Sequence, residues 1–229
     1  MARPADPLAR VSLLTSAEKI FSELGLERAK VEDIARAAGL SKGAFYLHFE
    51  SKEAAFRQVV ESFLARSSEL MNCEDTPGQE CSEKVSHRDL LTFWLQKDIE
   101  IFEYFWINRR LVRMVRACSG SVVYVLDAFQ AKHASRVEQL MKSLQDAGTF
   151  RTDFDVKLGA LVMLGGYHEL TNLVVKAEAK PDLLRIALEA QRTFVRCFAV
   201  PAVIRVAQSF TTDLTVTGSP VYVNATSRN

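Results

Sequence analysis

The stretch AGLSKGAFYLHFESKEAAF, residues 38–56, gathers hydrogen-bond donors and positive charge in one short segment. Lys42 and Lys52 are cations, and Tyr46 and His48 add further donors. Groups of these kinds bind phosphate oxygens and the edges of DNA bases, whereas leucines would suffice for packing. The residue types therefore indicate a surface that contacts nucleic acid.

Two short helices joined by a turn must position these side chains. Apolar spacing predicts a short helix over residues 31–38 that stops at Gly39. Ser41 stands as the N-cap of a second short helix, whose inward face is Phe45 and Phe49. A helix, a turn and a second helix form a helix-turn-helix, in which the second helix enters the major groove of DNA.

The residues VEDIARAAGLSKGAFYLHFESKEAAF resemble the DNA-binding signature of the TetR (tetracycline repressor) family of bacterial transcriptional regulators, and the match covers about residues 10–66. The resemblance implies an all-α fold, with an N-terminal three-helix DNA-binding domain and a larger C-terminal helical domain for ligand binding and dimerisation. It also implies base or backbone contacts by Lys42, Gly43, Ala44 and Leu47, and phosphate contacts by Ser41, Tyr46, His48 and Lys52.

One position departs from the family pattern at the start of the first of these two helices. The family usually has a capping threonine there, and this chain has Lys30. Lys30 has no acceptor with which to cap the helix, but it can still reach a phosphate. Glu32 and Asp33 favour the helix start through their interaction with the helix dipole. We therefore include Lys30 among the expected DNA contacts.

Helical periodicity continues through most of the chain. It predicts helices over residues 9–24, from Ser51 onward, and over 87–106, 108–117, 121–146, 154–177 and 181–199, the last with Pro181 in its first turn. A polar segment with Pro77 and Gly78 predicts a domain boundary. The expected division is a DNA-binding domain over 1–66, a linker over 67–86, a ligand-binding and dimerisation domain over 87–200, and a C-terminal extension over 201–229 that forms a hairpin or a mobile tail.

The composition is that of a globular protein. The 229 residues are 48% hydrophobic and 25% charged, and the net charge of +1 means that DNA binding must rest on a local surface. The first residues, MARPADPLARVSLL, lack an uninterrupted apolar run and a cleavage site, so we expect no signal peptide, a cytoplasmic location and no membrane partner. The four cysteines lie far apart, and we expect free thiols.

Apolar residues surround the predicted helix over 154–177 on all sides, so it must be covered on all sides. We expect one side to face the domain core and another to face a second copy of the chain; the alternative is a wholly internal core. The resemblance likewise implies that the last two long helices form a dimer interface. The candidate interface residues are Gly159, Met163, Gly166 and Leu170 on one helix and Leu184, Gln191, Phe194 and Phe198 on the other.

Aromatic residues crowd the middle of the chain and are interrupted by polar ones, which suits a cavity for a small, largely apolar effector. The candidate lining residues are Phe102, Trp106, Tyr124, His133, Tyr167 and His168.

Other polar groups favour no further chemistry. Arg109, Arg113 and Arg116 share one helical face, with Arg110 beside them; a solvated face is the favoured interpretation, and an anion site for an acidic effector is the alternative. Cys73, Cys81 and His87 lack a zinc spacing, so no metal or cofactor is expected. No nucleophile, base and acid form a catalytic motif, so we expect no enzyme.

The expected function is that of a homodimeric transcriptional repressor that a small molecule releases from double-stranded operator DNA. The alternative is a structural DNA-binding protein without a ligand.

Overall fold

The computed structural model describes residues 6–72, 86–117 and 121–210, and its regular elements there are all α-helices. A single β-bridge joins Phe150 and Ala199. The all-α expectation is therefore confirmed. In chain order the helices are α1 (Pro7–Leu24), α2 (Val31–Ala37), α3 (Lys42–His48), α4 (Lys52–Leu70), α5 (His87–Ile107), α6 (Arg109–Ala117), α7 (Ser121–Asp146), α8 (Val156–Lys176), α9 (Leu183–Phe198) and α10 (Pro201–Gln208).

The ends of the first four helices lie where the capping residues predict. Gly25 ends α1 with φ +78°, and Gly39 forms the turn between α2 and α3 with φ +70°, a conformation that glycine adopts without strain. Ser41 caps α3 by accepting the Ala44 N–H at 3.1 Å, and Ser51 caps α4 in the same way. At the start of α2, Lys30 makes no side-chain cap, as expected.

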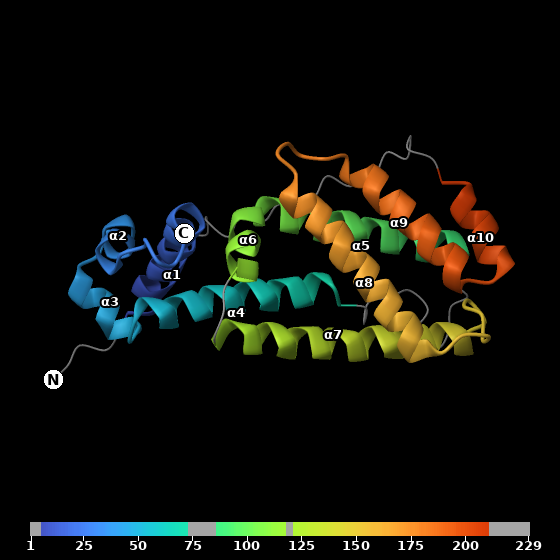
Figure 1. The fold of residues 1–229 in the computed structure, drawn as a ribbon, viewed down its shortest axis with the longest axis horizontal. Helices are drawn as coiled ribbons and strands as arrows, with labels where there is room; N and C mark the ends of the chain where they lie inside the picture. The colour runs from blue at the N-terminus through green and yellow to red at the C-terminus, as the bar shows by residue number, and fades with distance from the viewer. Residues whose placement is uncertain (1–5, 73–85, 118–120, 211–229) are drawn as a thin grey trace.

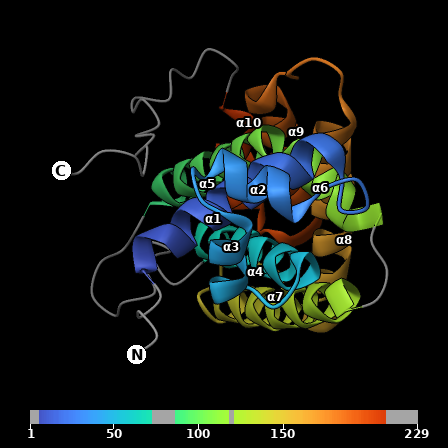
Figure 2. The same ribbon diagram turned by 90° about the vertical axis from the view of Figure 1, so that its left-hand side faces the viewer.

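The helix-turn-helix unit occupies one end of the long axis, and the larger bundle fills the rest (Figure 1). Seen from that end, α1, α2 and α3 lie in front of the bundle (Figure 2). The unit is not separate from the bundle, because α1 to α4 share one hydrophobic core with α5 and α6. The residues of α5 and α6 in this core are Phe105, Leu111, Val112 and Val115.

A second hydrophobic core holds the larger domain together. It joins α5, α7, α8, α9 and α10, with Phe102, Met141, Val174 and Leu188 almost fully buried. Residues of this second core surround a cavity, described below.

Two expectations about the C-terminal part need correction. Residues 201–208 form α10, which packs on α9 and α5 and buries Val203 and Ala207, whereas we expected an extension from residue 201. Pro201 permits this helix because a proline at the first helical position loses no intrahelical hydrogen bond. Helix α9 begins after the cap Asp182, so Pro181 precedes the helix rather than lying in its first turn. The expected hairpin or tail over 211–229 lies outside the described residues.

Candidate nucleic-acid interface and ligand cavity

The outer face of α3 is exposed to solvent. Phe45 is fully buried, while the neighbouring Tyr46 and Leu47 are 50% and 71% exposed. At Gly43 a Cβ would meet only the Ser41 Oγ, at 3.7 Å. Packing within the protein therefore does not require a glycine here, and its absent side chain leaves room for an outside partner.

Lys42 pairs with an acidic side chain from the preceding helix. Its Nζ lies 2.6 Å from Glu32 Oε1, and this hydrogen bond raises the pKa of the Lys42 ammonium and lowers that of the Glu32 carboxyl. Both side chains are about half exposed, so water screens the pair and little holds it closed. Lys42 can leave Glu32 for a phosphate or a base edge at small cost.

Lys52 has an internal role that the sequence did not indicate. Its Nζ donates to three backbone carbonyls between α1 and α2, those of Leu26 at 2.9 Å, Glu27 at 3.2 Å and Ala29 at 3.3 Å. An ammonium has three N–H donors, so all of them are engaged. The phosphate contact predicted for Lys52 would require breaking these bonds.

The remaining predicted DNA contacts lie on or beside the same end of the molecule. Lys30 and Ser41 are exposed, and Ala44 and His48 are half-buried. The Ser41 hydroxyl accepts from its own helix, but its O–H remains a donor. The helix-turn-helix thus presents a mixed apolar and basic surface to solvent.

A cavity of about 160 Å³ lies in the larger domain between the end of α4 and helices α5, α7, α8 and α9. Most of its wall is apolar. The lining residues used below are Leu70, Trp94, Asp98, His133, Tyr167 and Gln191.

Asp98 is the buried acid of this cavity. It is 7% exposed, and its Oδ2 accepts a hydrogen bond from the Tyr167 hydroxyl at 2.7 Å. Burial raises the pKa of the Asp98 carboxyl to about 7, and the Tyr167 hydrogen bond opposes part of that rise. The indole N–H of Trp94 is buried without a hydrogen-bond partner among the described residues. Burial, followed by the charge of Arg136, lowers the pKa of His133, which favours the neutral imidazole.

Two of the six predicted pocket residues, His133 and Tyr167, line the cavity. Phe102 and Trp106 are buried in the surrounding core, and His168 is exposed on the surface, because it directly follows Tyr167 on α8 and so points away from the cavity wall. The side chain of Tyr124 lies outside the described residues. Sequence reasoning missed Trp94 and Asp98. The available signal was an acid placed within the apolar spacing of Leu91, Leu95 and Phe102.

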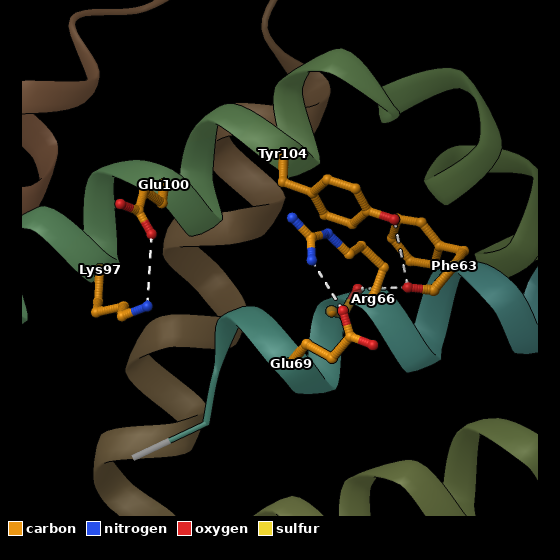
Figure 3. A network of polar contacts seen from close by, with 7 residues as sticks. Phe63, Arg66, Glu69, Lys97, Glu100 and Tyr104 are labelled. Atoms are coloured by element: carbon orange, nitrogen blue, oxygen red, sulfur yellow. Dashed lines mark hydrogen bonds and ion pairs between the residues drawn. The ribbon is translucent and has the colours of Figure 1, made fainter. Parts of the chain in front are cut away.

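Helix α4 connects the cavity to the DNA-binding end. Leu70, at the end of α4, lines the cavity, and Lys52, at its start, holds the loop between α1 and α2. Midway, the Phe63 and Tyr104 rings stack with centroids 5.3 Å apart, and the Tyr104 hydroxyl donates to the Phe63 carbonyl at 3.4 Å (Figure 3). The ion pairs Arg66–Glu69 on α4 and Lys97–Glu100 on α5 both lie on one side of this contact (Figure 3).

Two arginines of α6, Arg109 and Arg113, contact the ends of neighbouring helices, and Arg110 and Arg116 are exposed. Arg113 donates to the carbonyls of Val175 at 2.8 Å and Ala177 at 3.2 Å, at the end of α8. The Arg109 guanidinium lies 3.9 Å from the centre of the Trp106 ring and donates to the Trp106 carbonyl. These contacts place both side chains against the protein. The expected solvated face therefore does not describe Arg109 and Arg113.

The predicted dimer face on α8 is an internal surface. A Cβ at Gly166 would lie 2.6 Å from Phe194 Cζ, and one at Gly159 would lie 2.8 Å from the Phe154 ring and 3.3 Å from Phe198, all in the same chain. The remaining predicted members are also engaged internally: Met163, Leu170, Leu184 and Gln191 belong to the second core or the cavity wall. The glycines permit close packing of α8 on α9. The interface role of these residues stays a prediction, and Met163, Leu170, Leu184 and Phe194 are half-buried within the single chain.

The open face of α8 lies on the other side of the helix. Leu158, Leu161, Val162 and Leu173 are each more than half exposed, and Gly165 has nothing within 4 Å of a built Cβ. We call these five residues the α8 stripe. By length and hydropathy α8 alone among the described helices could cross a bilayer, a test that core helices of globular proteins also pass.

A helix-turn-helix with an open recognition helix, joined to a helical domain with a cavity, defines a DNA-binding regulator class. Residues 13–59 match the family model described as bacterial regulatory proteins, tetR family. The regulator YdgC of Bacillus subtilis is 27% identical over 169 residues, 71% of this chain and 79% of its own length. The repressor KstR2 of Rhodococcus jostii is 44% identical over 66 residues, 27% of this chain and 32% of its own length.

The fold of most of the chain also has solved counterparts. SmeT, the repressor of the Stenotrophomonas maltophilia multidrug efflux pump SmeDEF, aligns with a TM-score of 0.61 and 24% identity over 85% of this chain and 92% of its own. Another structure of SmeT is a complex with triclosan. Residues 13–59 thus form a DNA-binding domain of the TetR family, and the relatives named here are transcriptional regulators.

Proposed function

We propose that the protein is a homodimeric repressor that binds operator DNA through α3 and is released when a small, largely apolar molecule fills the cavity. The observation that carries this proposal is the placement of α4, which supports the DNA-binding unit at one end and lines the cavity at the other. A regulator of this kind acts in the cytoplasm, where the DNA is.

The dimer forms through the α8 stripe. Five apolar or small residues on one exposed helical face are an unusual surface for a monomer, because contiguous apolar side chains are unfavourable in contact with water. A second copy related by a two-fold axis would cover the stripe of each chain with that of the other. Two recognition helices then meet two half-sites of the operator.

The proposed DNA contacts follow from exposure on and around α3. Lys42 and Leu47 meet base edges, and Gly43 and Ala44 let the backbone approach the groove. Lys30, Ser41, Tyr46 and His48 bind phosphates. We omit Lys52 from the contacts, because its ammonium is engaged by carbonyls.

Release requires that the ligand bind the DNA-incompetent state more tightly than the DNA-bound state. A ligand in the cavity presses on Leu70, at the end of α4, and the contacts of α4 with the loop between α1 and α2 carry the displacement to α3. The cavity favours this model over that of a ligand-independent DNA-binding protein, which has no use for one.

The test is a footprint on the DNA upstream of the protein's own gene, followed by gel shifts at several salt concentrations. Lys42→Ala should weaken binding and reduce the salt slope by about 1 if Lys42 meets a phosphate, or relax preference at one base pair if it meets a base. Lys142→Ala, on α7 and paired with Asp146, is the matched control and should change nothing. The absence of any footprint, or equal behaviour of the two variants, would contradict the proposed interface.

A further inference from the structure

We propose that Asp98 and Tyr167 form a subsite for the protonated amine of an otherwise apolar ligand. The inference rests on the proposed function, since it assigns a ligand class to the same cavity. It concerns one group of the ligand, and the apolar walls receive the rest.

The geometry of Asp98 leaves acceptor capacity unused. Among the described residues, the hydrogen bond that reaches the carboxyl is that of the Tyr167 hydroxyl on Oδ2, at 2.7 Å. A carboxylate can accept about four hydrogen bonds, and among the described residues no arginine or lysine forms an ion pair with this one. An ionised Asp98 is therefore a buried acceptor that lacks a cation.

The other polar groups that line the cavity are those of Asn72, Lys97, His133, Thr171 and Gln191. The Thr171 hydroxyl of α8 donates to the Tyr167 carbonyl at 2.7 Å, and Gln191 of α9 donates to the Leu91 carbonyl at 2.7 Å. His133 of α7 stacks on Phe129, and burial lowers its pKa.

On α5 itself, the neighbouring Lys97 also lines the cavity, but its ion pair is with Glu100 and not with Asp98. Its ammonium lies 3.6 Å from Glu100 and 5.8 Å from the centre of the Phe93 ring. Glu100 is on the same side of α5 as Lys97, as Figure 3 shows. The Asp98 carboxylate therefore has acceptor capacity that a ligand donor can use.

The chemistry of this subsite discriminates between ligand classes. An ammonium supplies the positive charge that an ionised, buried Asp98 lacks, and it donates hydrogen bonds to the carboxylate oxygens. A carboxylate would place a second acid beside Asp98, and an alcohol would gain a hydrogen bond without charge. The amine is the class that gains most, and a phenyl or alkyl body fits the apolar walls.

Three probes with one skeleton test the proposal: 4-phenylbutylamine, 4-phenylbutan-1-ol and 4-phenylbutanoate, measured by calorimetry on the full chain at pH 8. The amine should bind wild type at least about tenfold more tightly than the alcohol, the range of a hydrogen bond to a charged group. Asp98→Asn keeps the shape and an acceptor for Tyr167, and it should abolish that preference. Between pH 8 and pH 6 the wild-type affinity for the amine should fall about tenfold as Asp98 becomes protonated.

Each outcome decides the proposal. Equal affinities for amine and alcohol, tighter binding of the carboxylate, an unchanged preference in Asp98→Asn, or no binding of the amine would overturn the amine subsite. None of these results affects the footprint, which Asp98→Asn should retain. Loss of specific DNA binding by wild type would instead overturn the proposed function.

Discussion

At the residue scale, Lys52 shows how a cation in a DNA-binding unit can serve the fold. It joins the start of α4 to three carbonyls of the loop between α1 and α2. These carbonyls come at the end of α1, where helical hydrogen bonding stops, so the ammonium satisfies acceptors that would otherwise depend on water. The side chain sets the position of α2, and therefore of α3, relative to α4.

Replacing Lys52 with methionine should keep the packing of its alkyl chain and remove the three hydrogen bonds. We expect a loss of about 1–3 kcal/mol in the free energy of unfolding, measured by urea denaturation. The salt slope of DNA binding should stay unchanged, because no phosphate contact is lost. Unchanged stability together with a salt slope lower by about 1 would show that Lys52 binds a phosphate.

Asp98 predicts a particular dependence of stability on pH. Its pKa is about 7 when folded and 3.8 when unfolded, so between these values the folded state binds the proton more tightly. The free energy of unfolding should therefore increase as pH falls from 7 to 4, because the buried acid becomes neutral.

Asp98→Asn isolates this contribution. The variant should be more stable than wild type at pH 8 by roughly 2–4 kcal/mol, and the difference should vanish near pH 4. Urea denaturation at four or five pH values measures both curves. A constant difference across that range would show that Asp98 is not buried as an acid.

At the element scale, α8 presents two faces with different partners. The face with Gly159 and Gly166 packs on α9 and its neighbours, and the α8 stripe faces outward. Helical periodicity places both faces on one hydrophobic helix. Only the packing of α9 decides which of the two is covered within the chain.

A pair of substitutions separates the two faces. Val162→Glu, at a position 64% exposed, should leave the melting temperature of the monomer fold unchanged and prevent association, since it puts a charge in the proposed interface. Light scattering should report about 25.7 kDa in place of twice that mass. A Val162→Glu variant that remained a dimer would exclude the α8 stripe as the interface.

Gly166→Leu is the counterpart on the internal face. Its side chain would collide with Phe194, so it should destabilise the fold by about 1–3 kcal/mol. Urea denaturation should show the lower free energy of unfolding. The molecular mass measured by light scattering should change only because the fold is destabilised.

At the scale of the whole molecule, the DNA-binding unit and the larger domain share a hydrophobic core. Phe63 and Leu64 of α4 pack in the same cluster as Phe105 and Leu111. This continuity links the orientation of α3 to the packing of α5 and α6. We therefore expect that the boundary at residue 66 does not mark an independent folding unit.

A fragment of residues 1–72 should therefore be less stable than the full chain. Without α5 and α6 it exposes the apolar side of α4, and we expect its melting temperature to fall by roughly 10 °C or more. Circular dichroism of both chains makes the comparison. A fragment that melts at the temperature of the full chain would establish a separable domain.

The sequence by itself determined the helices before α10, the caps at Ser41 and Ser51, and the helix-turn-helix. These depend on local chemistry: apolar spacing, a hydroxyl that accepts an N–H three residues on, and glycines with positive φ. Tyr46 and Leu47 on the open face follow from the same periodicity, because Phe45 fixes the inward side.

The tertiary structure alone decided which partner each surface met. The three carbonyls at Lys52, the burial of Asp98 beside Tyr167, and the contact of Gly166 with Phe194 all join residues far apart in the chain. A side chain's type and spacing give its helical face but not the helix packed against that face. Burial, charge balance and free volume depend on that neighbour, so the cavity acid and the exposed face of α8 required the assembled fold.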